Sequence, residues 1–261
     1  MLGRLEPLLV LLCTLGMIAA NALPNALQLR GETTGSVSGK VRTLFTPAGY
    51  AFSIWSLIYL GLLAFAVYQL LPAQRGRRLL DRLRRPYLVS CLLNSSWIFI
   101  WHYELTGLSA LVIAALLTSL LVCYVRLDSA RGAAPASVRL LVLAPFSLYA
   151  AWVTVATIVN VAVALTAYGW EGGPLAPATW SVVMTLVAFV LALVVAWPRR
   201  DWVFLAVVAW ATTAIGVAQA AYPAIRWTAH TVAVLLVVVG VVLFVQSRRA
   251  KERPKTGRTA E

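Results

Sequence analysis

The chain has 261 residues, of which 61% are hydrophobic and only 12% are charged, and its formal net charge is +13. A soluble domain is about 45–50% apolar and about 25% charged, so this composition excludes a water-facing surface over most of the molecule. The long unbroken apolar runs exclude the alternating pattern of a membrane β-barrel, and backbone groups in lipid must then pair within helices. We therefore predict an all-α integral membrane protein. The positive charge is expected to flank its spans, and nucleic-acid binding is not expected.

Taken in chain order, the apolar runs predict about eight membrane-spanning helices, since about 20 apolar residues cross the roughly 30 Å hydrocarbon core. The predicted spans are residues 8–27, 50–71, 87–101, 108–125, 140–165, 180–197, 202–221 and 228–245. The third span is short, and the fifth contains Pro145, which predicts a kink or an interfacial first turn. The first span has an alternative interpretation as a signal peptide cleaved after residue 22. Glu6 in its charged region and the continuation of the apolar run to Leu27 weaken that alternative.

The stretch 28–46, between the first two spans, is the longest non-apolar segment that joins two spans, and it is rich in Gly and Thr. Loops of this length often cover a functional site. We therefore name Phe45 and Pro47 as candidate lid residues, with a plain connector as the alternative.

The Lys and Arg residues predict the orientation of the spans. With eight spans, 18 of the 22 basic residues fall on one side of the membrane and four on the other. By the positive-inside rule, this bias predicts that both termini lie in the cytoplasm, in a bacterial cytoplasmic membrane. The arginine-rich segment 75–85 is expected to act mainly as this topology signal, with contact to anionic lipid as the alternative.

Three predicted spans carry aromatic and amide side chains at a spacing of three or four residues, which places each set on one helix face. The sets are Phe52, Trp55 and Tyr59 in the second span, Asn94, Trp97 and Trp101 in the third, and Tyr149, Trp152, Ala156 and Asn160 in the fifth. An amide within a span tends to face the bundle interior, so the aromatic side chains beside it should face inward too. The pattern predicts an aromatic-walled pocket for a planar or sterol-like ligand, with ordinary core packing as the alternative.

The tryptophans differ in their position along the predicted spans. Five lie at predicted span ends and are expected in the interfacial belt: Trp170, Trp180, Trp197, Trp202 and Trp227. Trp55, Trp97 and Trp152 lie deeper, so the belt does not explain them.

Three motifs carry a resemblance to a known family. Residues 47–59 read PAGYAFSIWSLIY, residues 93–97 read LNSSW, and residues 149–160 read YAAWVTVATIVN. In order and spacing they resemble the second-, third- and fifth-helix signatures of the tryptophan-rich sensory protein family, the TspO/MBR or translocator proteins. Tyr50 stands near the usual tryptophan of that pattern, Ser53 and Ile54 replace Gly-Pro, and Leu148 stands where proline is common.

The resemblance covers residues 5–168, and the family normally ends after five helices. It divides the chain into a five-helix ligand-binding bundle (1–168), a three-helix transmembrane extension (169–247) without an assigned motif, and a basic disordered cytoplasmic tail (248–261). It implies a receptor-like protein that binds porphyrins, haem breakdown products or sterols, in their sensing, transport or turnover. Trp55, Asn94, Trp97 and Trp152 would form the pocket walls, and the first loop would close over them.

The expected partners are the lipid bilayer and a small apolar planar ligand of porphyrin or haem type, with homodimer formation left open. No cofactor is required, and no catalytic residue or metal site is expected. Three alternatives remain: a secondary transporter, a membrane-assembly subunit, and an enzyme that photo-oxidises its ligand. His102 and His230 are expected near span ends, and His102 beside Glu104 is a weak candidate for cation or haem contact.

Overall fold

The structure is a computed structural model that describes residues 2–27, 31–41, 43–132 and 134–252. It is helical throughout, and no strand occurs in these described ranges. The longer helices are α1 (Leu2–Ala26), α3 (Ile54–Tyr68), α4 (Arg78–His102), α5 (Thr106–Arg126), α8 (Ala144–Ala167), α9 (Pro177–Ala196), α10 (Trp202–Ala218) and α11 (Pro223–Glu252). Short turns join them: α2 (Thr34–Lys40), η2 (Gly49–Ser53), η3 (Pro72–Gln74), α6 (Asp128–Arg131), α7 (Ala136–Val138) and η4 (Arg139–Leu143).

The all-α membrane architecture predicted from composition is confirmed. Six helical stretches are long and apolar enough to cross a bilayer: 5–24, 49–68, 106–126, 136–167, 177–196 and 223–247. Helix α10 is apolar but shorter. Helix α4 contains the predicted third span but begins within the arginine-rich segment, which makes its first turns polar. The count of eight spans therefore stays a prediction.

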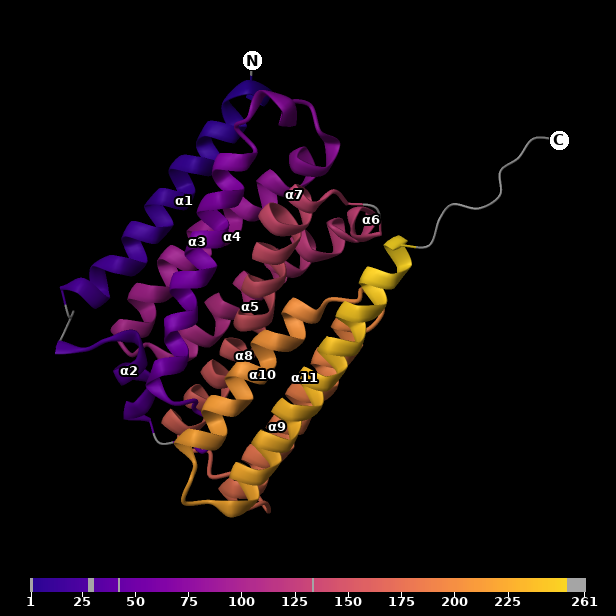
Figure 1. Ribbon diagram of the computed structural model, residues 1–261. Coiled ribbons are helices and arrows are strands. Elements are labelled where there is room, and N and C mark those ends of the chain that lie inside the picture. The colour runs from indigo at the N-terminus through magenta and orange to yellow at the C-terminus, as the bar shows by residue number, and fades with distance from the viewer. Residues whose placement is uncertain (1, 28–30, 42, 133, 253–261) are drawn as a thin grey trace.

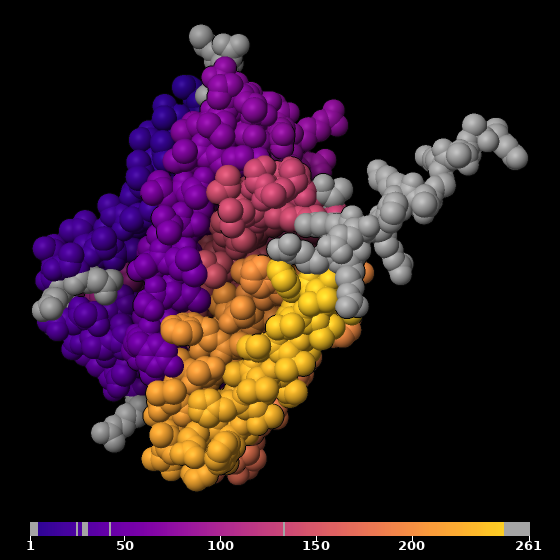
Figure 2. Space-filling model, viewed as in Figure 1, coloured from indigo at the N-terminus to yellow at the C-terminus, as the bar shows by residue number. Residues whose placement is uncertain are grey.

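The long helices run side by side in two groups (Figure 1). Helices α1, α3, α4, α5 and α8 form one group, the five-helix unit, and α9, α10 and α11 form the extension, which packs against α8 through α10. The first turn of α1 and the last turns of α11 point to the same end of the bundle, here called the basic end. Helix α2 and η2 lie at the opposite end, here called the lid end. In the space-filling view the extension forms one continuous face beside the five-helix unit (Figure 2).

Several local features differ from the expectations. The stretch 28–46 contains a short helix, α2, whose first turn is closed by a capping box between Thr33 and Ser36. The arginine-rich segment is not a loop, because α4 begins at Arg78. Pro145 lies in the first turn of α8, in agreement with the predicted first turn, but a π-helical turn, η4, directly precedes this helix. In membrane helices, local π-helical turns help to pair again the backbone groups that a proline leaves free.

The end of the chain also differs. Helix α11 continues to Glu252, so the first residues of the predicted tail are helical. The remainder of that tail, 253–261, lies outside the described residues, as do 28–30 and 42 of the predicted lid loop.

The tryptophans divide by depth as the sequence suggested. Those expected at the interface are exposed at helix ends (Trp170, Trp197, Trp202 and Trp227), except Trp180, which is half-buried and donates its indole N–H to the Gly172 carbonyl. By contrast, Trp55, Trp97 and Trp152 are 7%, 2% and 2% exposed. The deep tryptophans therefore belong to the interior of the five-helix unit.

Candidate ligand-binding site

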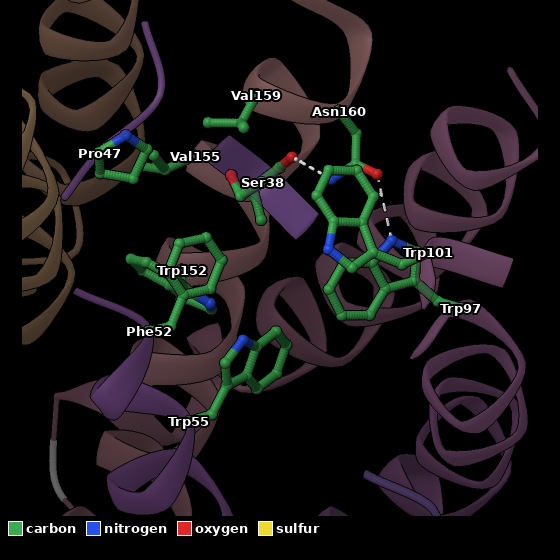
Figure 3. A pocket seen from close by; sticks show the side chains of 11 residues that line it. Ser38, Pro47, Phe52, Trp55, Trp97, Trp101, Trp152, Val155, Val159 and Asn160 are labelled. Carbon is green, nitrogen blue, oxygen red and sulfur yellow. Dashed lines mark hydrogen bonds between the residues drawn. The ribbon is translucent and has the colours of Figure 1, made fainter. Parts of the chain in front are cut away.

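A small cavity lies between η2, α3, α4 and α8 at the lid end of the five-helix unit (Figure 3). Its volume is about 10 Å³, enough for about one water molecule. It is lined by Ser38, Pro47, Phe52, Trp55, Trp97, Trp101, Trp152, Val155, Ala156, Val159 and Asn160. The inward faces predicted for the second, third and fifth spans therefore meet at one place.

The aromatic side chains fill most of the space between these helices. The Trp55 ring stacks on Tyr59 at 5.5 Å between centroids and lies 5.8 Å from Trp97. The edges of Phe52 and Trp55 meet Trp152 at 5.9 and 6.3 Å. Edge-to-face and offset contacts in this range are each worth about 0.5–1.5 kcal/mol beyond the area they bury. The walls are thus held together by their own rings, and a planar ligand must separate them.

Asn160 fixes one wall of the cavity through its amide. Its Oδ1 accepts hydrogen bonds from the Trp97 indole N–H at 3.2 Å and from the Ser109 hydroxyl at 2.6 Å. Its Nδ2 donates to the Ala156 carbonyl at 2.8 Å. Both the oxygen and the nitrogen of the amide are therefore hydrogen-bonded, and the bond to Trp97 sets the orientation of that ring.

Four of the predicted site residues do not line the cavity. Asn94 donates to the Tyr149 hydroxyl at 2.6 Å and accepts from Asn21 of α1 at 2.7 Å. Tyr149 and Tyr59 both contact the Trp55 ring, so they support the wall from behind. Phe45, the fourth, is buried at 3% exposure without reaching the cavity. The sequence placed these four near the site but did not distinguish lining residues from supporting ones.

Two buried polar atoms of the lining have no hydrogen-bond partner in the described part of the chain. They are the indole Nε1 of Trp152 and the hydroxyl Oγ of Ser38. Ser38 is fully buried and Trp152 is 2% exposed. An unpaired buried donor costs about 1–3 kcal/mol, so a ligand that offers a hydrogen-bond acceptor here would recover that free energy.

Helix α2 closes the cavity at the lid end. The Trp101 indole donates to the Thr34 carbonyl at 3.2 Å, and Lys40 forms an ion pair with Glu104 at 2.8 Å. The hydrogen bond to Glu104, and a second one to Glu32, raise the pKa of Lys40 above its usual 10.5. The lysine therefore stays protonated, and the ion pair intact, until the pH rises above 10.5.

A second, larger space lies beside α2. This groove has a volume of about 360 Å³ and lies between α2, the α4–α5 turn and the end of α8. Lys40, Glu104, Val163 and Tyr168 are among its lining residues, and Trp101 lines both the groove and the small cavity. The Trp101 ring is therefore the wall between the two spaces, and its displacement together with α2 would join them.

Sequence reasoning missed two apolar lining residues, Val155 and Val159, and three polar contributors to this site. Ser38, on α2, was missed because the stretch 28–46 was expected to be a loop, in which no residue is assigned to a helix face. Asn21 of α1 carried the same signal as Asn94, an amide inside an apolar run, and could have been found by it. Ser109 of α5 carried no signal, because serine is common in membrane helices.

His102 is the last residue of α4, as the expected position near a span end requires, but its side chain does not lie on the surface. The ring is buried at 2% exposure rather than interfacial, and its Nδ1 lies 2.9 Å from the Ile98 carbonyl. Its Nε2 has no hydrogen-bond partner among the described residues. Among the described residues no group of three or more His, Cys, Asp or Glu side chains lies together as a metal site would require.

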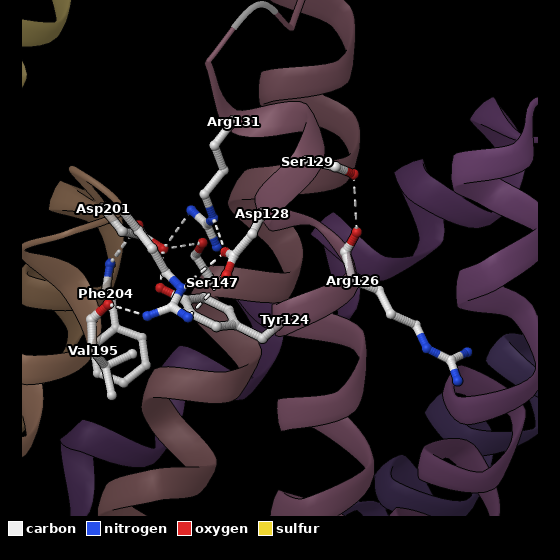
Figure 4. A network of polar contacts seen from close by, with 10 residues as sticks. Tyr124, Arg126, Asp128, Ser129, Arg131, Ser147, Val195, Asp201 and Phe204 are labelled. Carbon is white, nitrogen blue, oxygen red and sulfur yellow. Dashed lines mark hydrogen bonds and ion pairs between the residues drawn. The ribbon is translucent and has the colours of Figure 1, made fainter.

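A cluster of charges that the sequence did not predict joins the two helix groups at the basic end (Figure 4). Asp201, at the start of α10, is 4% exposed. Its carboxylate accepts hydrogen bonds from the Tyr124 hydroxyl at 2.6 Å, the Arg131 guanidinium at 2.9 Å and the Ser147 hydroxyl. Buried charges are tolerated when they are paired in this way, so the cluster fixes α10 to α5, α6 and α8.

Arg199 extends the same cluster. Its guanidinium donates three hydrogen bonds, of 2.8, 2.9 and 3.1 Å, to the Asp128 carboxylate and lies 5.4 Å from the Tyr124 ring centre. The hydrogen bonds to Asp128 raise the pKa of Arg199 above its usual value. The α9–α10 turn is thereby held to the five-helix unit by charge as well as by packing.

Comparison with known families gives one match. A family model described as TSPO-like protein matches residues 7–242. The match continues through α9 and α10 and into α11, beyond the five helices whose motifs carried the resemblance. No curated protein and no solved structure matches the chain.

Proposed function

The chain belongs to the TSPO-like protein family, and from this premise we propose that it is a membrane receptor of sensor type. It binds a porphyrin, another tetrapyrrole or a sterol-like ligand between α3, α4 and α8. The observation that supports this most is the meeting of Trp55, Trp97 and Trp152 around one cavity. Flat aromatic walls with few polar groups suit a large planar apolar ligand.

The size of the cavity indicates how such a ligand would enter. Ligand pockets usually measure about 300–1,000 Å³, so a cavity of about 10 Å³ corresponds to a closed state. The neighbouring groove of about 360 Å³ supplies the missing volume once Trp101 and α2 move aside. The Trp152 indole N–H would then pair with an acceptor on the ligand.

The proposal gives these residues a binding role and assigns no catalytic residue and no resident cofactor. It places the protein in a bacterial cytoplasmic membrane with both termini in the cytoplasm. Supporting this, the arginine-rich start of α4 and the charged α5–α7 and α9–α10 turns lie at the basic end, toward which the first turn of α1 and the last turns of α11 point. Cytoplasmic loops carry such an excess of basic residues.

Titration of the purified protein with protoporphyrin, followed by tryptophan fluorescence, tests the binding proposal. We expect saturable quenching, with affinity about tenfold weaker in Trp55→Ala and in Trp152→Ala, since each change removes one aromatic wall. Trp197→Ala is the matched control. It also removes one of the ten indoles, but from an exposed helix end.

Two results would reject the proposal. One is quenching that rises linearly with protoporphyrin and never saturates. The other is an affinity in the Trp55 and Trp152 variants equal to that of the Trp197 control.

A further inference from the structure

The extension contacts the segment that covers the cavity. Residues 44–53, here called the lid segment, run from the end of the predicted lid loop through η2 to the start of α3. The segment carries two of the lining residues, Pro47 and Phe52. Phe52 meets the ring of Trp152 edge-on, so a shift of the segment moves one wall of the cavity.

Four hydrogen bonds join α9 and α10 to this segment. The Ser181 hydroxyl donates to the Leu44 carbonyl at 2.6 Å, and the Trp210 indole donates to the Ala51 carbonyl at 3.2 Å. The backbone N–H of Ala48 donates to the Ala214 carbonyl at 3.1 Å, and the Gln219 amide lies 3.5 Å from the Thr46 carbonyl.

These bonds use the backbone of the lid segment, so they fix its path and not merely one side chain. Ser181 is 2% exposed, and its bond is shielded from competing water. The Trp210 ring also meets Tyr50 edge-on at 5.3 Å between centroids. One aromatic side chain of α10 therefore holds the lid segment by both its ring and its N–H.

The other end of the extension is anchored independently. Asp201, at the first turn of α10, is tied to the five-helix unit through Tyr124 and Arg131. Helix α10 is thus held at the basic end by charges and reaches the lid segment at its far end. The lid segment consequently rests against a support that is itself fixed to the rest of the protein.

We infer that the extension positions the lid of the ligand pocket, with Trp210 and Ser181 as its positioning residues. The extension is then a part of the binding unit that keeps the cavity closed until a ligand enters. This inference concerns the lid itself, and its consequence for ligand entry rests on the proposed binding function. A planar ligand must separate the rings around the cavity, and the lid segment carries the Phe52 ring, so weaker support of this segment should let ligand enter faster.

Hydrogen–deuterium exchange of the full chain in detergent, without ligand, tests the inference directly. In Trp210→Phe the ring on Tyr50 is kept and the donor to Ala51 is lost. We expect peptides covering 44–53 to exchange about fivefold faster than in the wild type, as expected for the loss of one hydrogen bond. Exchange in α4 should not change, and Ser181→Ala should act on the same peptides.

Trp202→Phe is the matched control. Trp202 lies on the same helix with similar exposure, but its ring packs on Phe244 of α11 and not on the lid segment. Equal exchange of the 44–53 peptides in Trp210→Phe and Trp202→Phe would overturn the inference.

A second readout uses ligand. Stopped-flow mixing with protoporphyrin should show association about fivefold faster in Trp210→Phe than in Trp202→Phe. Unchanged association despite faster lid exchange would overturn the role in ligand entry. If protoporphyrin does not bind the wild type at all, the proposed function fails, and the exchange experiment alone decides whether the extension positions the lid.

Discussion

The five-helix unit and the extension are packed with different kinds of side chain. The largest fully buried side chains of the five-helix unit are rings: Trp97, Trp152, Tyr87, Tyr124, Tyr149, Phe65 and Phe146. The extension adds one ring, Phe204, to the largest fully buried side chains, and five of its residues at 0% exposure are alanines: Ala192, Ala196, Ala211, Ala214 and Ala229. Small residues let membrane helices approach closely, whereas rings hold them apart.

This difference separates two tasks. Rings that meet at their edges leave crevices that a ligand can widen, and both the cavity and the groove border the five-helix unit. Close helix contacts give a stiff support, which suits a group of helices that holds a lid in place. The comparison predicts that the extension tolerates added volume poorly and that the junction between the two groups depends on its buried charges.

The largest effect is expected at that junction. Asp201→Ala would remove the buried carboxylate that accepts hydrogen bonds from Tyr124, Ser147 and Arg131, and would leave Arg131 with its 3.3 Å pair to Asp128. We expect this to cost about 3 kcal/mol. Denaturant unfolding in detergent should show this loss in the free energy of unfolding. Glu171→Ala, which removes an exposed carboxylate near the start of the extension, should change it by less than about 0.5 kcal/mol. Equal stability of the two variants would mean that the charges do not hold the groups together.

A smaller effect is expected from added volume within the extension. Ala192 is fully buried on α9, and Ala192→Leu should lower the free energy of unfolding by about 1–3 kcal/mol, because close contacts must separate. Val190→Leu, on the exposed face of the same helix, is the control and should be nearly neutral. If the two variants were equally stable, the extension would not be closely packed, and the contrast with the five-helix unit would fail.

The smallest effect is expected at the ion pair between Lys40 of α2 and Glu104. Lys40→Met removes the ion pair to Glu104 and keeps all but the terminal atom of the side-chain length, and exposed pairs contribute little. Protoporphyrin association should become only about two- to fivefold faster. Because the pKa of Lys40 is raised, the wild-type rate should not change between pH 7 and pH 10, and it should rise at higher pH as the lysine loses its proton. Slower association in Lys40→Met would contradict the prediction that this ion pair holds α2 over the cavity.

Much of the five-helix unit could be predicted from the sequence, because its signals are local. The spacing of Phe52, Trp55 and Tyr59 defines a helix face, and Asn94 and Asn160 show which face turns inward. These two rules predict from the sequence that the cavity-lining tryptophans lie close together. They could not separate Trp101, which lines the cavity, from Tyr59, which supports it, since both share the helical period.

The missing features depend on residues far apart in the chain. Asp201 has the ordinary position of a helix cap, and nothing near it indicates that Tyr124 and Arg131 will meet it. The bond from Trp210 to Ala51 likewise links two segments without a shared motif. Helix α2 was missed for another reason: its residues, TGSVSGK, have weak helix propensity, and only its capping box and its packing explain it.

The most direct test of the whole account is an experimental structure of the full chain saturated with protoporphyrin. We expect ligand density between α3, α4 and α8, in contact with Trp55 and Trp152, with Trp101 and α2 displaced and α9–α11 unmoved. Ligand density confined to the outer faces of α9 and α11, with the aromatic cavity still closed, would contradict it.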